Sequence, residues 1–146
     1  MNKRQTSLIF LLTVIFFTGL LLTSCKEEGK VISKPDEFKH VYEAGENKLL
    51  QAIAQVFKDK GFGTAAINQE KNQVESDYLI QDDWRTKGTA RVKKINWKEC
   101  EVALSVITEK RISNGWEMRR LLGKSQYDTF FDAIELQLYQ EMYKVK

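Results

Sequence analysis

The first 25 residues constrain this chain most, because an apolar run near its start ends at a cysteine. Two basic residues precede the nearly continuous apolar stretch of residues 8–22, and the small residues Thr23 and Ser24 lead to Cys25. A positive start, an apolar core and small residues before a cleavage point predict a secretory signal peptide over residues 1–24. A membrane-spanning helix needs about 20 apolar residues, so the run is too short to favour a transmembrane segment.

The four residues Leu22, Thr23, Ser24 and Cys25 resemble the lipobox of bacterial lipoproteins, in which an aliphatic residue and two small ones precede a cysteine. The resemblance implies that signal peptidase II recognises the first three and cuts after Ser24. It also implies a diacylglycerol on the Cys25 sulfur and an acyl chain on the new amino terminus, and we expect no other cofactor. Each buried methylene contributes about 0.8 kcal/mol, so several acyl chains hold a protein stably at a membrane, whereas a single chain binds reversibly. The alternative is an ordinary cysteine after an ordinary signal peptide.

The residues after the cysteine bear on which membrane would hold the anchor. Lys26, Glu27 and Glu28 follow directly, so the Asp that favours inner-membrane retention in enterobacteria is absent from that position. The run is similar to the surface-export signal of Bacteroidetes lipoproteins, although a solvated tether would carry the same charges. We therefore expect a lipid-anchored protein of the cell envelope, with the outer membrane favoured over the inner membrane. The sequence does not select the inner or the outer face of that membrane.

Composition divides the remainder into a tether and one domain. Residues 25–37 begin with the lipidated cysteine, are rich in charge and hold the only proline, which is typical of a tether. Residues 38–146 have the length of one globular domain. With Cys25 lipidated, Cys100 has no disulfide partner, and we expect it to be a small buried residue at the start of a strand.

Two amphipathic helices are predicted. Residues 46–60 place apolar side chains on one stripe, and Gly61 suits the left-handed conformation that ends a helix. The second helix is predicted to start at Ser125, with Asp128 completing a capping pattern. Its apolar stripe is continuous: Tyr127, Phe130, Phe131, Ile134, Leu138 and Met142.

The segments between the helices predict β-structure. Strands are expected over residues 38–43, 62–68 and 73–80, followed by a hairpin of 88–97 and 100–112. In the third strand Val74, Ser76, Tyr78 and Ile80 would share one face. Irregular alternation suggests a bulge near Lys93 and Lys94.

The last part of the predicted sheet region contains a turn signal. Asn114-Gly115 predicts a tight turn, after which residues 116–122 fit either a strand or a loop. Together these elements predict an α+β fold of two layers, a mainly antiparallel sheet of about four to five strands packed against two helices.

From about residue 38 to 143 the chain resembles the helix-grip domains of BamC-type envelope lipoproteins. An aliphatic helix ends in Gly61-Phe62, an Asp83-Trp84 pair lies among the strands, and residues 131–134 (Phe-Asp-Ala-Ile) belong to the closing helix. The resemblance implies a helix-grip-like fold and a role in envelope or outer-membrane assembly. BamC has two such domains and a long N-terminal region, whereas this chain has one domain and a short tether, and fold alone does not fix function.

Catalysis has little support in the sequence. His40 is the only histidine, which argues against a Ser-His-Asp triad or a multi-histidine metal site. Asp82 and Asp83 would point to opposite faces of a strand and fit a turn better. We therefore expect no enzyme activity, no catalytic residue and no metal site.

A basic segment is the strongest candidate for binding. Residues 84–124 contain 11 basic and 4 acidic residues. Within 85–98 six basic residues occur without an acid: Arg85, Lys87, Arg91, Lys93, Lys94 and Lys98. They could bind an anionic glycan, a lipid head group or an acidic partner. The alternative is a solvated sheet face whose lysines discourage edge pairing. Nucleic acid is not expected, because the chain carries an export signal.

These features predict a lipid-anchored envelope protein that presents a non-catalytic interaction or scaffolding domain to a protein partner. The alternative is a carrier or sensor that holds lipid or anionic glycan between the sheet and the last helix, and whether a small ligand binds stays open. Trp84 and Trp116 are expected in or beside loops, where they would cap the core or meet a partner.

Overall fold

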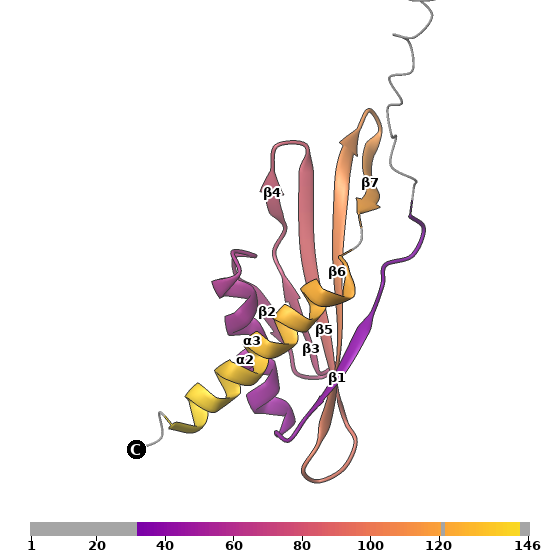
Figure 1. The fold of residues 1–146 in the computed structure, drawn as a ribbon. Coiled ribbons are helices and arrows are strands. Elements are labelled where there is room, and N and C mark those ends of the chain that lie inside the picture. Colours follow the sequence, from indigo (N-terminus) through magenta and orange to yellow (C-terminus); the bar gives the residue numbers. More distant parts are fainter. Residues whose placement is uncertain (1–31, 121, 144–146) are drawn as a thin grey trace, which may run out of the picture.

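The computed structural model describes residues 32–120 and 122–143. It confirms an α+β fold in which an antiparallel sheet of five main strands packs against two helices (Figure 1). The strands are β1 (Phe38–Tyr42), β2 (Ala65–Asn68), β3 (Gln73–Ser76), β4 (Leu79–Gln81), β5 (Trp84–Lys94), β6 (Cys100–Ile112) and β7 (Gly115–Arg120). The helices are α2 (Glu46–Asp59) and α3 (Lys124–Tyr143). The main strand order is β1-β6-β5-β3-β2, with β4 paired to β5 and β7 paired to β6.

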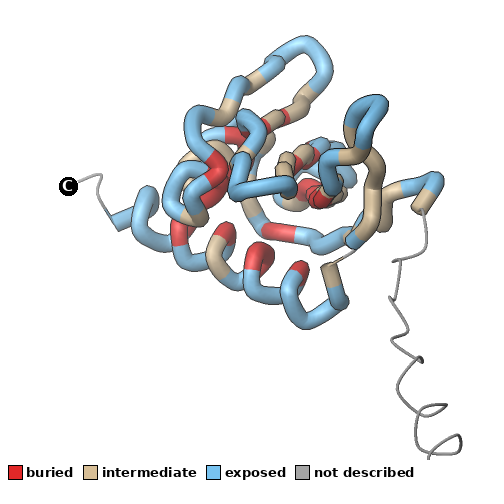
Figure 2. Tube along the Cα trace, turned by 90° about the horizontal axis from the view of Figure 1, so that it is seen from above, coloured by how far each residue is buried: buried red, intermediate tan, exposed pale blue. Residues whose placement is uncertain are grey.

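The two long strands β5 and β6 run the length of the sheet, but the helices cover only part of it. Figure 1 shows α2 and α3 across the lower half, while β4, β7 and the upper parts of β5 and β6 extend beyond them. We call this extension, residues 78–87 and 107–120, the arm. Buried residues gather between the helices and the covered half of the sheet (Figure 2). We call the sheet face away from the helices the open face.

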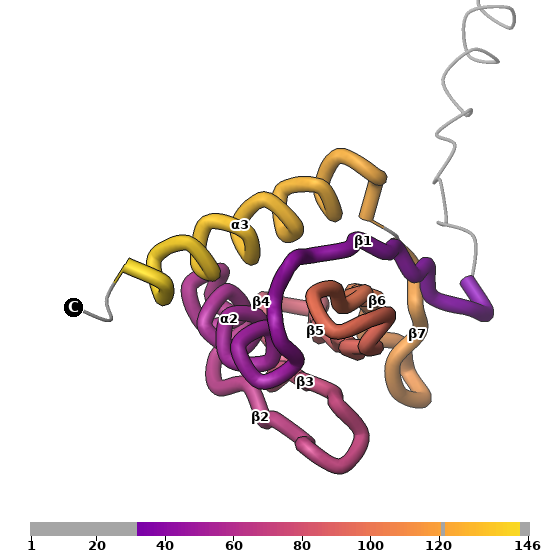
Figure 3. The backbone as a smooth tube through the Cα atoms, turned by 90° about the horizontal axis from the view of Figure 1, so that it is seen from below, coloured from indigo at the N-terminus to yellow at the C-terminus, as the bar shows by residue number. Residues whose placement is uncertain are grey.

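The core forms where α2 crosses the sheet. Phe57 is fully buried, and its ring lies so close to Gly88 of β5 that a Cβ on that glycine would come within 2.9 Å of it. Helix α3 packs on α2 and β1, as Figure 3 shows from below. The Tyr42 hydroxyl of β1 donates a hydrogen bond of 2.9 Å to the Phe131 carbonyl of α3. These contacts join both helices to the sheet.

Tyr127 of α3 continues the sheet edge beyond Phe38, the first residue of β1. The last pair of the β1–β6 ladder joins Phe38 and Leu104. Two residues further along β6, the Val106 N–H donates to the Tyr127 hydroxyl oxygen at 3.0 Å, and that hydroxyl donates to the Asp36 carbonyl at 3.3 Å. Burial raises the pKa of Tyr127, so the hydroxyl keeps its proton.

Several predicted features are confirmed. Strand β1 and helix α2 lie where the apolar pattern places them, and Gly61 has φ of +83° after the helix. Asp82 and Asp83 form the turn between β4 and β5, and residues 113–114 form the turn before β7. Cys100 is the first residue of β6 and is buried. Residues 116–120 belong to a strand.

The predicted strand over 73–80 is wrong, because it is two strands with different registers. Val74 pairs with Ala90, but after a break Ile80 pairs with Arg85, a shift of one residue along β5. A shift of one residue moves side chains to the other face of a sheet. Val74 is therefore buried while Ile80 is 60% exposed, and Tyr78 is also exposed.

The predicted hairpin of residues 88–97 and 100–112 is longer and more regular in the structure than its sequence predicts. β5 begins at Trp84, and its pairing with β6 continues without a shift to Lys94 and Cys100, so no bulge lies near Lys93 and Lys94. The irregularity lies between β6 and β7, at Thr108. Thr86 and Gly88 occupy the helix-side face of β5, where apolar residues would have made the alternation visible.

The start of α3 also differs from its prediction. The helix begins at Lys124, and the Gly123 N–H donates to the Gln126 side-chain oxygen at 2.9 Å, while the Gln126 N–H donates back to the Gly123 carbonyl. This reciprocal arrangement, rather than Ser125 with Asp128, caps the helix. The buried stripe ends at Leu138, because Met142 is 52% exposed.

Candidate functional site

The structure separates the six basic residues of the predicted patch. Because side chains alternate along a strand, Arg85, Lys87, Arg91 and Lys93 of β5 share the open face. Lys94 lies on the helix side, and the sixth residue, Lys98, lies in the loop between β5 and β6. The lipobox residues Leu22, Thr23, Ser24 and Cys25 lie outside the described residues.

Three of these cations face carboxylates from other parts of the chain. Arg85 Nε lies 2.5 Å from the Glu109 carboxylate of β6. Lys87 Nζ lies 2.7 Å from the Glu75 carboxylate of β3, and this hydrogen bond lowers the pKa of Glu75. Arg91 pairs with Glu37. The open face is therefore largely a set of ion pairs, which suits the solvated-face interpretation of this part of the segment.

The other three lysines gather toward the end of the sheet opposite the arm. Lys93, Lys94 and Lys98 form no ion pair with another residue of the described ranges. All three are exposed and lie at or beside the loop of residues 95–99, which we call the Trp97 loop. These lysines place positive charge beside this loop that is outside the ion pairs of the described residues.

The Trp97 loop is held by hydrogen bonds centred on one asparagine. The Asn96 side-chain oxygen accepts from the Lys98 and Glu99 N–H groups at 2.8 and 2.9 Å, and its amide donates to the Glu99 carboxylate at 2.6 Å. The Ile95 N–H donates to the Glu99 carbonyl at 2.9 Å. Trp97 is nevertheless 83% exposed, with Lys98 Nζ 4.6 Å from its ring centroid. An ordered loop thus presents a large apolar ring to solvent.

The sequence predicts Trp97 as the last residue of a strand, whereas β5 ends at Lys94 and Trp97 lies in the loop. Asn96 and Lys98 beside it are a local signal for a loop, since asparagine side chains bond to nearby backbone groups in turns. Single exposed apolar residues are common, but a ring of this size held at a hairpin end is typical of a contact residue.

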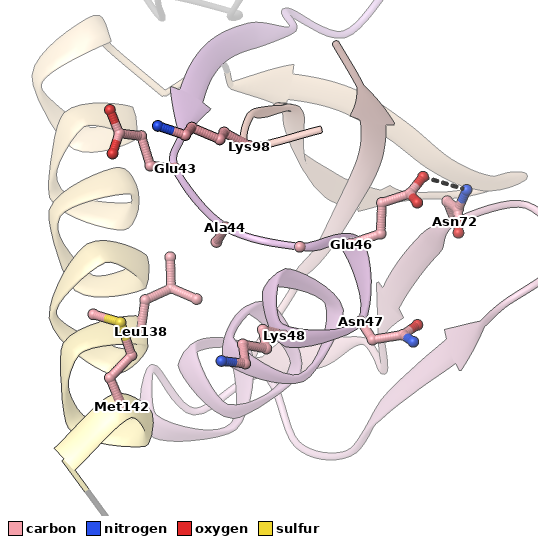
Figure 4. A pocket seen from close by; sticks show the side chains of 10 residues that line it. Glu43, Ala44, Glu46, Asn47, Lys48, Asn72, Lys98, Leu138 and Met142 are labelled. Atoms are coloured by element: carbon pink, nitrogen blue, oxygen red, sulfur yellow. Dashed lines mark hydrogen bonds between the residues drawn. The ribbon is translucent and has the colours of Figure 1, made fainter. Parts of the chain in front are cut away.

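A cleft of about 550 Å³ lies beside the Trp97 loop (Figure 4). Leu138 and Met142 of α3 form an apolar wall, while Glu43 and Lys98 approach each other at one side and Lys48 lies at another. Its opposite side is fixed by a hydrogen bond of 3.2 Å from the Asn72 side chain to Glu46, drawn in Figure 4. The cleft combines an apolar wall with a charged rim of both signs.

The remaining tryptophans lie in the arm and not over the core. On the open face, the Arg85 guanidinium lies 4.3 Å from the Tyr78 ring centroid and 4.5 Å from that of Trp116, and Arg111 lies 5.1 Å from the latter. On the helix side, Trp84 is flanked by Arg120 at 5.3 Å and by Lys110 at 5.7 Å. Each ring is therefore covered by cations.

The structure does not bring His40 of β1 together with Asp82 and Asp83, which lie in the turn at the tip of the arm. His40 is exposed on β1 and stacks on Phe131 at a centroid distance of 5.3 Å. Burial raises the pKa of Cys100, which disfavours the reactive thiolate. Within residues 32–120 and 122–143, no group of three or more His, Cys, Asp and Glu residues is arranged to hold a metal ion. None of the helices in those ranges has the length and apolarity to cross a membrane.

The N-terminal sequence and the geometry above are the basis for inferring function. No protein-family model matches the chain, and the comparison with curated proteins gives no match.

Proposed function

We propose that this chain is a lipid-anchored bacterial envelope protein, held at a membrane through Cys25, that presents a non-catalytic interaction domain. The outer membrane is the favoured location. The observation that carries the interaction role is Trp97, which is 83% exposed on a loop fixed by its own hydrogen bonds. Anchoring would raise the effective concentration of the domain near other envelope components without any further contact.

The chemistry around Trp97 favours an acidic protein surface as the partner. Tryptophan is among the residues that contribute most to binding energy at protein interfaces. Ile95, which is 51% exposed, adds apolar area, and Lys93, Lys94 and Lys98 add positive charge. Charge complementarity mainly speeds and orients association, so the ring would supply affinity and the lysines would select an acidic partner.

The cleft beside the loop favours a second candidate, a carrier or sensor of lipid or anionic glycan. Its volume of about 550 Å³ lies in the range of small-molecule sites. Leu138 and Met142 suit an acyl chain, and Lys48 and Lys98 suit an anionic group. Lipid recovered by mass spectrometry from the purified full chain, and lost in Met142→Asp, which changes an exposed residue of the apolar wall, would support this candidate. A chain that carries only its covalent lipid would contradict it.

Photo-crosslinking in cells tests the interaction role. A photoreactive phenylalanine analogue replaces Trp97 in the full chain, and the matched control places it at Ser113, an exposed turn residue at the arm end. We expect a protein adduct of one defined mass from position 97 and none from position 113. The adduct should disappear when Lys93, Lys94 and Lys98 are changed to Glu, and it should weaken in Cys25→Ala.

Two outcomes would contradict the proposal. Equal crosslinking from positions 97 and 113 would show that the loop has no special role. An adduct that is unaffected by the charge changes would remove the acidic-partner argument, and an adduct with glycan in place of protein would favour the second candidate.

A further inference from the structure

The path of the chain into the domain limits which end of the sheet can lie near the anchoring membrane. Ile32, the first described residue, donates its N–H to the Met118 carbonyl of β7 at 3.0 Å. Seven peptide links join Ile32 to Cys25, so they span at most about 25 Å. If Cys25 carries the lipid, as the proposed function holds, the edge of the arm lies within that distance of the bilayer surface.

The Trp97 loop lies much further from this point. Met118 pairs with Glu109 of β6, and Cys100 lies nine residues further along the same strand. At about 3.3 Å per residue, the loop end is about 30 Å beyond the arm residues. Figure 1 shows the loop and the arm at opposite ends of the sheet. Of these two ends of the sheet, the arm is the one held close to the anchor.

The entering chain also selects one face of the arm. Glu37 pairs with Arg91 of the open face. A second cleft, lined by residues 34–37 together with Arg91 and Ser105, places this segment over the same face. From Ile32 at the edge of β7 the chain continues over the open face at residues 34–37, the face on which Tyr78 and Trp116 lie.

The open face of the arm has the side chains of a membrane interface. Tyr78 and Ile80 are 43% and 60% exposed, and Trp116 is half-buried beneath Arg111. Tryptophan and tyrosine are enriched at the headgroup level of bilayers, and basic residues are attracted to anionic lipids. Arg85 is neutralised by Glu109, which leaves Arg111 as the cation available to a lipid phosphate.

The acidic residues of the arm set how it could approach a bilayer. Asp82 and Asp83 form the turn at its tip, where they would oppose insertion into an anionic surface. Glu117 is on the helix side, and its carboxylate oxygen lies 2.5 Å from a guanidinium nitrogen of Arg119. Within the arm, the open face carries Glu109, which is paired with Arg85, so a sideways approach by this part of the face avoids like-charge contact.

We propose that the open face of the arm, formed by Tyr78, Ile80, Arg111 and Trp116, rests on the headgroup region of the anchoring membrane and contacts anionic phospholipid. This inference depends on the lipid anchor of the proposed function. It gives the domain two attachments to the bilayer, and it directs the Trp97 loop away from that surface.

The three tryptophans provide the test, because each reports a different place. The full lipidated chain is reconstituted in vesicles of phosphatidylcholine and phosphatidylglycerol, with and without bromine on the acyl chains. Three variants each keep one tryptophan, at position 84, 97 or 116, and carry Phe at the other two. We expect bromine to quench Trp116 most, Trp84 on the opposite face less, and Trp97 not at all.

A charge variant and its control separate binding from folding effects. Arg111→Gln should reduce the quenching of Trp116 in vesicles that contain phosphatidylglycerol, whereas Lys98→Gln at the other end should not change it. Circular dichroism of each variant checks that the fold is retained. Quenching of Trp97 equal to that of Trp116, or no quenching of Trp116 in chains that float with the vesicles, would overturn the inference while leaving the anchor intact. A chain that fails to float would contradict the anchor, and with it this inference.

Discussion

The two halves of strand β5 show two ways of stabilising one sheet. From Gly88 to Val92 its helix-side residues are buried under α2, next to Phe57. In the arm the same face carries Trp84, which is only half-buried and is covered by cations. A buried apolar side chain contributes about 1.5–3 kcal/mol, whereas an exposed cation–π contact contributes about 0.5–1 kcal/mol.

The two halves therefore differ in which of them can contact other surfaces without loss of the fold. The covered half has its apolar area committed to the core, so changes there unfold the domain. The arm has partly exposed aromatic rings on both faces, so changes there should alter binding with little effect on the global fold. The following predictions test that contrast, from the largest expected effect to the smallest.

Leu104→Ala should cause the largest loss of stability. Leu104 of β6 is fully buried, and removing a buried leucine side chain costs about 2–5 kcal/mol. Urea unfolding measures the change. The control is Ile80→Ala in the arm, which should change the free energy of unfolding by no more than about 0.5 kcal/mol because the side chain is exposed. Equal losses in the two variants would break the contrast between the halves.

Gly88→Ala should destabilise the domain by about 1–3 kcal/mol, because the new Cβ would lie within 2.9 Å of the Phe57 ring. Thermal unfolding measures this loss. Phe57→Leu in the same chain makes room for the methyl group, so the double variant should lose less than the sum of the two single changes. Additive losses would show that this close contact does not set the boundary between the halves.

Arg85→Gln should loosen the arm and spare the core. It removes the cation between Tyr78 and Trp116 together with the pair to Glu109, a loss of about 1 kcal/mol. Amide hydrogen exchange should become faster in β4 and β7, while Leu104 keeps its protection. Faster exchange at Leu104 by the same factor would mean that the arm and the core unfold as one unit.

The pair of Glu75 with Lys87 should give the smallest effect, and its sign depends on pH. The pKa of Glu75 is lower in the folded chain than its ordinary value. The pair therefore stabilises the fold above the ordinary glutamate pKa of about 4.3, and the contribution is lost as pH falls through the folded value. Because the Glu75 side chain is 44% exposed, the ion pair contributes less than about 1 kcal/mol to the free energy of unfolding.

The comparison of wild type with Glu75→Gln checks this pH dependence. The two free energies of unfolding should differ at pH 7 and converge at acid pH. A difference that persists at pH 3 would show that the pair contributes through packing and not through charge.

The sequence predicted the covered half better than the arm, for physical reasons. Helix α2, strand β1 and the buried stripe of α3 follow from apolar periodicity, because their burial is what creates the pattern. The break between Ser76 and Leu79 could not be predicted this way, because the apolar residues on either side of it fit one continuous alternating strand. Pairing with β5, which is a tertiary interaction, decides which face Ile80 occupies.

The candidate site was predicted only in part. The run of basic residues was visible in the sequence. Which of them form ion pairs was not, because Glu37, Glu75 and Glu109 come from distant segments and meet the cations only in the fold. The sequence pattern also predicts Trp97 within a strand, although β5 ends at Lys94. Its exposure depends on the hydrogen bonds of Asn96, which end β5 at Lys94.

Metabolic labelling with a fatty acid tests the central claim most directly, because both ends of the sheet gain their roles from the anchor. The full chain and Cys25→Ala are expressed in a bacterium that receives a fatty acid with a clickable label, and the purified chains are compared. The account predicts label on the wild-type chain in the membrane fraction, and no label with release from the membrane in Cys25→Ala. An unlabelled wild-type chain, or a Cys25→Ala chain that stays equally membrane-bound, would contradict it.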